Sequence, residues 1–193
     1  MAHEPGPHTL DAEAVRTWSS LALAALGRAR EDIDAINVYP VADADTGTNL
    51  YLTAESADRA LTEAFAEPPA RVTDGTSGTP SLPEAVRAYA YGALIGARGN
   101  SGTILAQLLR GVADVLGAEP DGPGGGPLLA RALTRAAEEA YQAVAHPVEG
   151  TMLTVAGAAA RAAATAGAPA PTAADVARDA YEGGRAALSL RKS

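Results

Sequence analysis

Two carboxylates separated by one residue, Asp43 and Asp45, precede a Thr-Gly-Thr turn at 46–48. Two like charges this close repel each other unless a cation lies between them. Oxygen ligands with little else nearby suit Mg²⁺ or Ca²⁺ better than zinc. The helix expected directly after the acids would point its free backbone N–H groups toward an anion at the same place. The segment therefore predicts a metal site beside an anion site, as a nucleotide phosphate requires.

Other interpretations of this acidic turn differ in how well they fit. An EF-hand fails on spacing: with Asp43 as position 1, the glycine falls at position 5 instead of 6, and position 12 is Ala54 instead of Glu. A solvated helix cap, with Asp45 as the N-cap, stays open as an alternative. The apolar segment 38–41 favours the metal site, because a rigid lead-in would hold the acids in place.

A second segment has glycine at every third position from 96 to 102. Glycine lets the backbone approach a ligand closely, and Asn100 and Ser101 can cap the helix that follows. No Gly-Lys-Ser/Thr follows, so this is not a Walker A loop. Binding of phosphate by backbone amides is the chemistry that it favours. Arg98 could neutralise phosphate charge or form a structural ion pair.

A third segment, 147–154, again leads from a proline-bearing loop into a helix. Glu149 and Thr151 lie near the start of that helix, where a structural cap is the default explanation. Met152 is more often a core residue, although its adaptable thioether also suits a base pocket.

Helical spacing dominates between the Gly- and Pro-rich breaks, and no segment alternates convincingly with period two. The sequence predicts an all-α fold, a closed antiparallel barrel or bundle of amphipathic helices in one domain over 1–193. Seven helices are expected, at about 10–30, 48–65, 81–96, 100–116, 127–145, 151–166 and 172–190. If neighbouring helices alternate in direction, the second, fourth and sixth begin at the same end, and their dipoles converge on one anion site.

The composition excludes several classes of function. A net charge of −8 without a basic stripe argues against a nucleic-acid-binding protein. The absence of cysteine excludes disulfides and thiolate chemistry. The first residues lack a signal-peptide pattern, and no apolar run is long enough to span a membrane. We expect a soluble, cytoplasmic protein.

Taken together, the three segments resemble the dihydroxyacetone kinase L-domain (DhaL-like) family. The motifs are Asn-Val-Tyr-Pro-Val-x-Asp-x-Asp-Thr-Gly-Thr-Asn at 37–49, Gly-Ala-Arg-Gly-Asn-Ser-Gly at 96–102 and Pro-Val-Glu-Gly-Thr-x-Leu-Thr-Val at 147–155. They are most similar to the N-terminal ATP-binding domain in the kinase component of bacterial fatty acid kinase. The resemblance implies an antiparallel barrel of eight helices with ATP or ADP and two Mg²⁺ at one end.

The resemblance also implies roles for individual residues. Asp43 and Asp45 match the metal-binding acids, through which they would serve catalysis, and Asn37 lies at a motif position close to the metals. Independently of the resemblance, Arg98 is a catalytic candidate because its charge could neutralise phosphate. The nucleotide contacts are implied for Thr46, Gly47, Thr48, Asn49, Gly99, Asn100, Ser101 and Gly102 at the phosphates, and for Thr151 and Met152 at the base or ribose.

In that family a separate fatty-acid-binding (DegV-like) protein presents the acyl carboxylate to the γ-phosphate, giving an acyl phosphate. A carboxylate, with an ordinary pKa of roughly 4–5, needs no general base. None is evident here, because His3, His8 and His146 all lie outside the three motifs. A non-catalytic nucleotide-binding module and a kinase for a small hydroxylated substrate such as dihydroxyacetone stay open. So does assembly into a homodimer.

Two departures from the family pattern stand out. Ala44 occupies the position where the family has glycine between the two acids. If that position has a positive φ, alanine would cost about 1 kcal/mol there. The chain also has seven expected helices instead of eight, so it could be a fragment of a longer protein.

Overall fold

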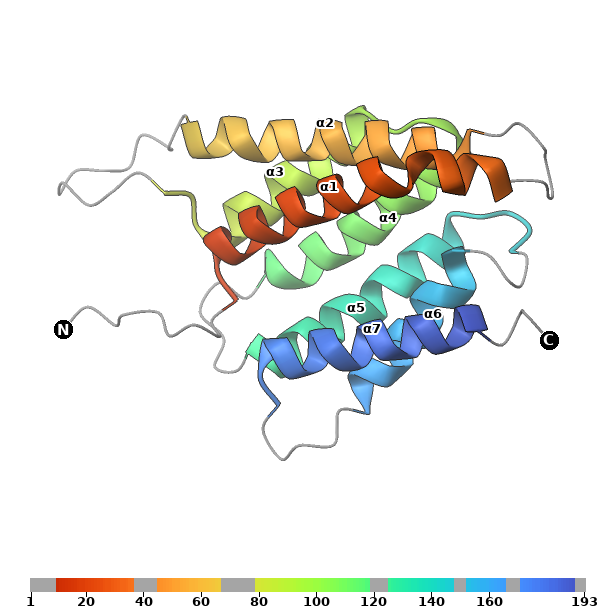
Figure 1. Cartoon of the computed structure of the whole chain (residues 1–193). Helices are drawn as coiled ribbons and strands as arrows, with labels where there is room; N and C mark the ends of the chain where they lie inside the picture. The colour runs from red at the N-terminus through yellow and green to blue at the C-terminus, as the bar shows by residue number, and fades with distance from the viewer. Residues whose placement is uncertain are drawn as a thin grey trace, which may run out of the picture.

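The computed structural model describes residues 10–36, 45–66, 79–118, 125–147, 152–165 and 171–189. These ranges hold seven helices and no strand, which confirms the all-α prediction (Figure 1). The helices are α1 (Ala12–Ile36), α2 (Thr46–Ala66), α3 (Leu82–Ile95), α4 (Gly99–Leu116), α5 (Gly125–Gln142), α6 (Met152–Ala164) and α7 (Ala173–Ser189).

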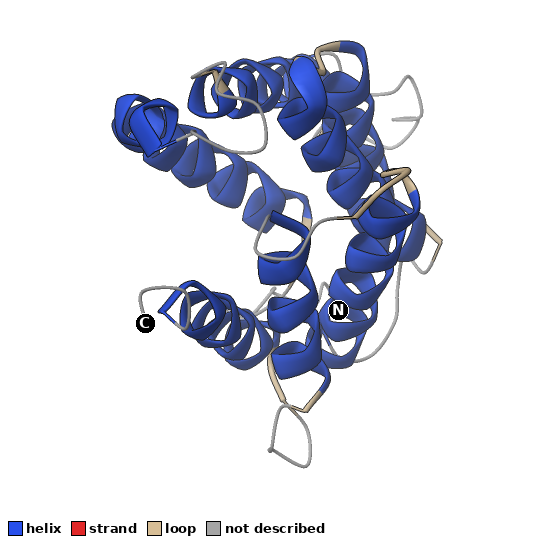
Figure 2. Cartoon of the chain, turned by 90° about the vertical axis from the view of Figure 1, so that its right-hand side faces the viewer, coloured by secondary structure: helices blue, strands red, loops and turns tan. Residues whose placement is uncertain are grey.

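The helices pack in the order of the sequence, each against the one before it. Consecutive helices run in opposite directions, so α2, α4 and α6 all begin at the right-hand end in Figure 1. This confirms that the second, fourth and sixth helices share a direction. Figure 2 looks onto that end and shows the helices as a curved bundle. Among the described residues, α1 and α7 make no extensive contact with each other.

Local sequence signals explain where several helices begin. Asp11 caps α1, since its Oδ1 accepts a hydrogen bond from the backbone N–H of Ala14 at 2.8 Å. Ser81 and Glu84 form a capping box at the start of α3, as their spacing predicts. Helix α1 continues to Ile36, six residues beyond the predicted end, because no glycine or proline interrupts 31–36.

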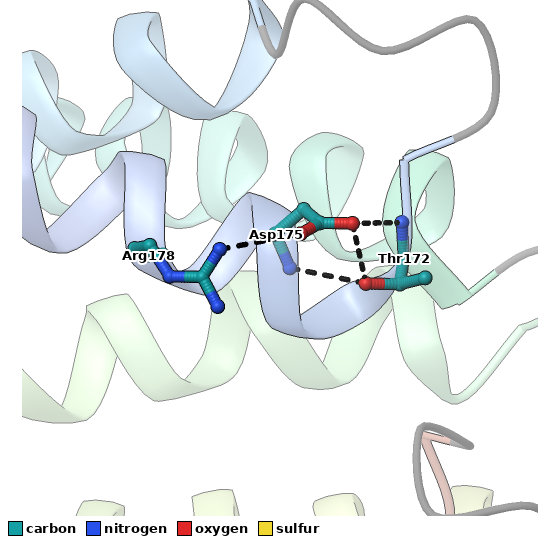
Figure 3. A network of polar contacts seen from close by, with 3 residues as sticks. All are labelled: Thr172, Asp175 and Arg178. Carbon is teal, nitrogen blue, oxygen red and sulfur yellow. Dashed lines mark hydrogen bonds and ion pairs between the residues drawn. The ribbon is translucent and has the colours of Figure 1, made fainter.

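A second cap with the same reciprocal geometry starts α7 (Figure 3). The Thr172 Oγ1 accepts from the Asp175 N–H at 3.2 Å and donates to the Asp175 carboxylate at 2.7 Å. The Thr172 N–H donates to the same carboxylate at 3.1 Å, and Arg178 lies 3.4 Å from its other oxygen. These hydrogen bonds, with that from the Thr172 hydroxyl the strongest influence, hold the pKa of Asp175 below its ordinary value.

Alanine makes up much of the core, and its small side chain lets helices pack closely. The larger cluster contains residues of each of the helices α1, α2, α3, α4 and α5, and includes the fully buried Leu61. A smaller cluster, which includes the fully buried Val176, joins α7 to α5 and α6. None of the helices in the described ranges is long and apolar enough to cross a membrane.

Candidate functional site

The first two chemistry-bearing segments meet where α2 and α4 begin. The Ser101 hydroxyl donates to the Thr46 hydroxyl across the two helices at 3.5 Å. Gly99 lies against the side chain of Asn49, which leaves no room for a Cβ. The structure therefore brings together two segments that are about fifty residues apart in the sequence, with their predicted phosphate-binding residues side by side.

Thr53, on the second turn of α2, holds this junction in register. Its side chain is fully buried, its Oγ1 donates to the Asn49 carbonyl at 2.7 Å, and it accepts from the Arg98 N–H at 3.1 Å. A Cβ on Gly102 would overlap the same hydroxyl. None of the sequence motifs includes Thr53. Its only sequence signal is a polar residue on the otherwise apolar buried face of α2.

The first turn of α4 leaves backbone donors without helical acceptors. The first backbone hydrogen bond of this helix runs from the Gly102 N–H to the Arg98 carbonyl at 2.9 Å. The N–H groups of Gly99, Asn100 and Ser101 therefore have no acceptor within the helix. Gly99 adopts φ +58°, a conformation that favours glycine, and both it and Asn100 are exposed. This is the positive end of a helix dipole open to an anion.

Arg98 lies at the N-cap position of α4, and its side chain makes no capping hydrogen bond. The side chain is exposed and forms no ion pair with another residue in the described ranges. The structural ion pair considered from the sequence is therefore not observed there. Arg98 is therefore an exposed positive charge on the residue that precedes the open helix end, and this charge can attract an anion.

The start of α2 differs from the start of α4, because a carboxylate of the protein already caps it. Asp34, on the last turn of α1, accepts hydrogen bonds at one oxygen from the N–H groups of Gly47 (2.6 Å) and Thr48 (3.1 Å). Its other oxygen accepts from the Thr48 hydroxyl at 2.7 Å. That hydroxyl, followed by the two N–H groups and the charge of Arg30, holds the pKa of Asp34 below its ordinary value, although partial burial acts in the opposite direction.

Gly47 makes this close approach of α1 and α2 possible. A Cβ at this position would overlap the Arg30 carbonyl and lie 3.0 Å from the Asp34 carboxylate. The glycine of the Thr-Gly-Thr turn is thus explained by packing against α1. Asp34 is not recognisable from the sequence, because it comes 13 residues before Gly47 and belongs to no local capping pattern.

Asp45 precedes the first residue of α2, and its backbone carbonyl accepts the first helical hydrogen bond, from the Asn49 N–H at 2.8 Å. Its half-buried carboxylate accepts no hydrogen bond from another residue in the described part of the chain. Asp34 therefore caps α2, which is the role that the alternative interpretation gave to Asp45. A carboxylate such as that of Asp45, which is not used in a hydrogen bond to another described residue, suits Mg²⁺ as a ligand.

Several predicted site residues lie outside the described residues, namely Asn37, Asp43 and Thr151, together with Ala44. Within the described ranges, no group of three or more His, Asp or Glu side chains could hold a metal ion. Asp45 is therefore the one predicted metal ligand whose surroundings the described ranges reveal.

Met152, the remaining member of the third segment's predicted pair, is the half-buried first residue of α6. Helix α6 begins at the same end as α2 and α4, but in the described ranges it packs against α5 and α7 and makes no extensive contact with α2 or α4. A cavity of about 390 Å³ lies between the end of α5 and the start of α6. Its lining residues are Ala137, Glu138, Tyr141, Gln142, Pro147, Leu153, Thr154, Gly157 and Arg161.

Comparison with known proteins agrees with the resemblance drawn from the three segments. The family model described as the DAK2 domain matches residues 40–190. Uncharacterized proteins of Staphylococcus aureus strains USA300, NCTC 8325 and N315 are each 40% identical to the chain over 130 residues. The match covers 67% of this chain and 21% of each relative, so the chain corresponds to about a fifth of their length. The chain belongs to the DAK2 domain family, whose members are nucleotide-binding, kinase-related domains.

Proposed function

We propose that the chain is a single Mg²⁺-dependent kinase domain that transfers the γ-phosphate of ATP to a fatty-acid carboxylate. In this proposal a separate DegV-like fatty-acid-binding protein presents the carboxylate, and the product is an acyl phosphate. The reaction would take place in the cytoplasm, where ATP is available. The matched region makes up about a fifth of the length of each relative. The proposal therefore assigns this domain a part in the reaction.

The junction of α2 and α4 is the observation that supports this proposal most strongly. The N–H groups at the start of α4 offer donors for phosphate oxygens, and the hydroxyls of Thr46 and Ser101 lie beside them. Asp45 adds a carboxylate that is not used as a cap. We propose that it would hold Mg²⁺ together with Asp43 and Asn37, and that the metal would neutralise phosphate charge there.

The acceptor is proposed from the chemistry that the junction offers. The segments 45–49 and 96–102 contain neither histidine nor lysine, so they supply no ordinary general base. A carboxylate acceptor needs none, because it is already ionised at neutral pH. An alcohol acceptor such as dihydroxyacetone would benefit from one, which makes it the second candidate. A nucleotide-binding module without transfer is the third, motivated by Ala44.

Titration calorimetry with ATP, with and without Mg²⁺, tests nucleotide binding directly. We expect Mg²⁺-dependent binding that is lost in Asp45→Ala, while circular dichroism shows unchanged helix content. Binding that is indifferent to Mg²⁺, or unaffected by this substitution, would contradict the metal assignment. Light scattering on the same sample distinguishes a homodimer from a monomer.

An ATP-consumption assay separates the three candidate functions. Turnover that requires a fatty-acid-loaded carrier supports the acyl kinase, and turnover with dihydroxyacetone alone supports the small-substrate kinase. Binding without turnover under either condition supports the non-catalytic module.

A further inference from the structure

Asp34 has a role at the site that neither the sequence motifs nor the family match assigns. We infer that Asp34 is a positioning residue: it caps α2 in place of Asp45 and so keeps the Asp45 carboxylate available to a cation. The inference rests on the proposed function, since it concerns how the proposed Mg²⁺ site is held.

The N-cap of α2 is the place where Asp45 would ordinarily be used. An aspartate at this position normally accepts hydrogen bonds from the N–H groups two and three residues later. For Asp45 these donors are the N–H groups of Gly47 and Thr48. Both of them donate to Asp34 instead, at 2.6 and 3.1 Å. The Asp45 side chain, which is best placed to cap its own helix, is therefore not used as the cap.

The contact is built into the packing of the two helices. Asp34 also accepts from the Thr48 hydroxyl at 2.7 Å, so both of its oxygens are used by α2. Gly47 is needed for this approach, because a Cβ would overlap the Arg30 carbonyl of α1. Asp34 thus ties the last turn of α1 to the first turn of α2, where Thr46 meets the Ser101 hydroxyl.

Asp34 and Asp45 therefore have different roles. Asp34 accepts from the two helix N–H groups with one oxygen and from the Thr48 hydroxyl with the other, which makes it a poor metal ligand. Asp45 receives no hydrogen bond from another described residue and can turn an oxygen toward Mg²⁺. If Asp34 is removed, Asp45 can fold back onto Gly47 and Thr48 as an ordinary N-cap. The helix then keeps a cap, while the metal loses a ligand.

Calorimetric ATP titrations of the full chain at a series of Mg²⁺ concentrations test this inference. In Asp34→Ala, the Mg²⁺ concentration for half-maximal ATP binding should rise about tenfold or more, as for other residues that orient metal ligands. Asp34→Asn keeps an acceptor oxygen for the two N–H groups, so it should lie between Asp34→Ala and the wild type. An Asp34→Ala protein with the wild-type Mg²⁺ requirement would show that Asp34 is a structural cap only.

Asp175→Ala is the matched control. Asp175 also accepts from a threonine hydroxyl and from backbone N–H at a helix start, but α7 begins at the opposite end of the molecule (Figure 1). Its loss should lower the melting temperature and leave the Mg²⁺ requirement within about twofold of the wild type. A comparable rise in the Mg²⁺ requirement in this variant would mean that loss of any cap perturbs the site, which overturns the specific role of Asp34.

A double-mutant cycle tests whether Asp34 acts through Asp45. In an Asp45→Asn background, where the Mg²⁺ requirement is already raised, adding Asp34→Ala should change it by less than about twofold. If the second substitution adds its full effect, Asp34 does not act through Asp45. Mg²⁺-independent or absent ATP binding in the wild type refutes the proposed function itself, and is thereby distinguished from failure of the positioning role alone.

Discussion

Thr53→Val probes how the two helix starts are joined. Valine has the shape of threonine but lacks the hydroxyl that accepts from the Arg98 N–H and donates to the Asn49 carbonyl. A buried polar group that loses its partner costs about 1–3 kcal/mol. We take about 2 kcal/mol as the expected loss in the free energy of unfolding, because Thr53 is fully buried. For a chain of this size, that loss lowers the melting temperature by about 4–8 °C.

Thr134→Val is the matched control for this substitution. The Thr134 hydroxyl also donates to the carbonyl four residues earlier, at 3.0 Å, but it is exposed, so water can replace it. Threonine and valine have similar helix propensities, and the stability of this variant should stay within about 0.5 kcal/mol of the wild type. Urea unfolding followed by circular dichroism measures both variants. Equal stability of the Thr53 and Thr134 variants would refute the view that the buried hydroxyl holds α4 against α2.

Three further predictions concern other parts of the molecule. Gly99→Ala should lose about 1 kcal/mol from its positive φ, and more from overlap with Asn49, with weaker ATP binding by calorimetry; wild-type affinity would argue against a phosphate contact here. Leu61→Ala should lose about 2–5 kcal/mol in urea unfolding, whereas the exposed Leu21→Ala should change stability by less than about 0.5 kcal/mol, and equal losses would contradict the assignment of Leu61 to the core. The pKa of Asp175 is lowered in the folded state, so its contribution to stability is complete above about pH 4 and disappears as the pH falls through the folded-state pKa. Asp175→Asn should therefore flatten the fall of the melting temperature below about pH 4, and an unchanged slope would contradict this.

The order and approximate extent of the helices follow from local sequence. Capping residues and proline positions predict the start of α3 and α7, and Asp11 is a local capping residue for α1. The end of α1 shows the largest difference from prediction. Residues 31–36 include no glycine or proline, and Asp34 is held by its hydrogen bonds to α2, a contact that only packing creates.

The site is only partly predictable from the sequence. The glycines at 99 and 102 and the residues around Thr46 are recognisable as a binding motif, and the structure places them together. Met152 begins its helix at the same end, but no extensive contact joins α6 to the other two described helix starts. The roles of Met152 and of the residues at the starts of α2 and α4 in binding nucleotide stay predictions.

The sequence by itself determines the all-α fold, the helix order and the family, because helical periodicity, caps and ordered motifs are local properties of the chain. The tertiary structure decides which side chains meet. Asp34 and Thr53 act on residues 13 to 45 positions away, and such pairings depend on how helices pack. The aspartate before the Thr-Gly-Thr turn is therefore joined by a carboxylate from α1 that no local pattern could reveal.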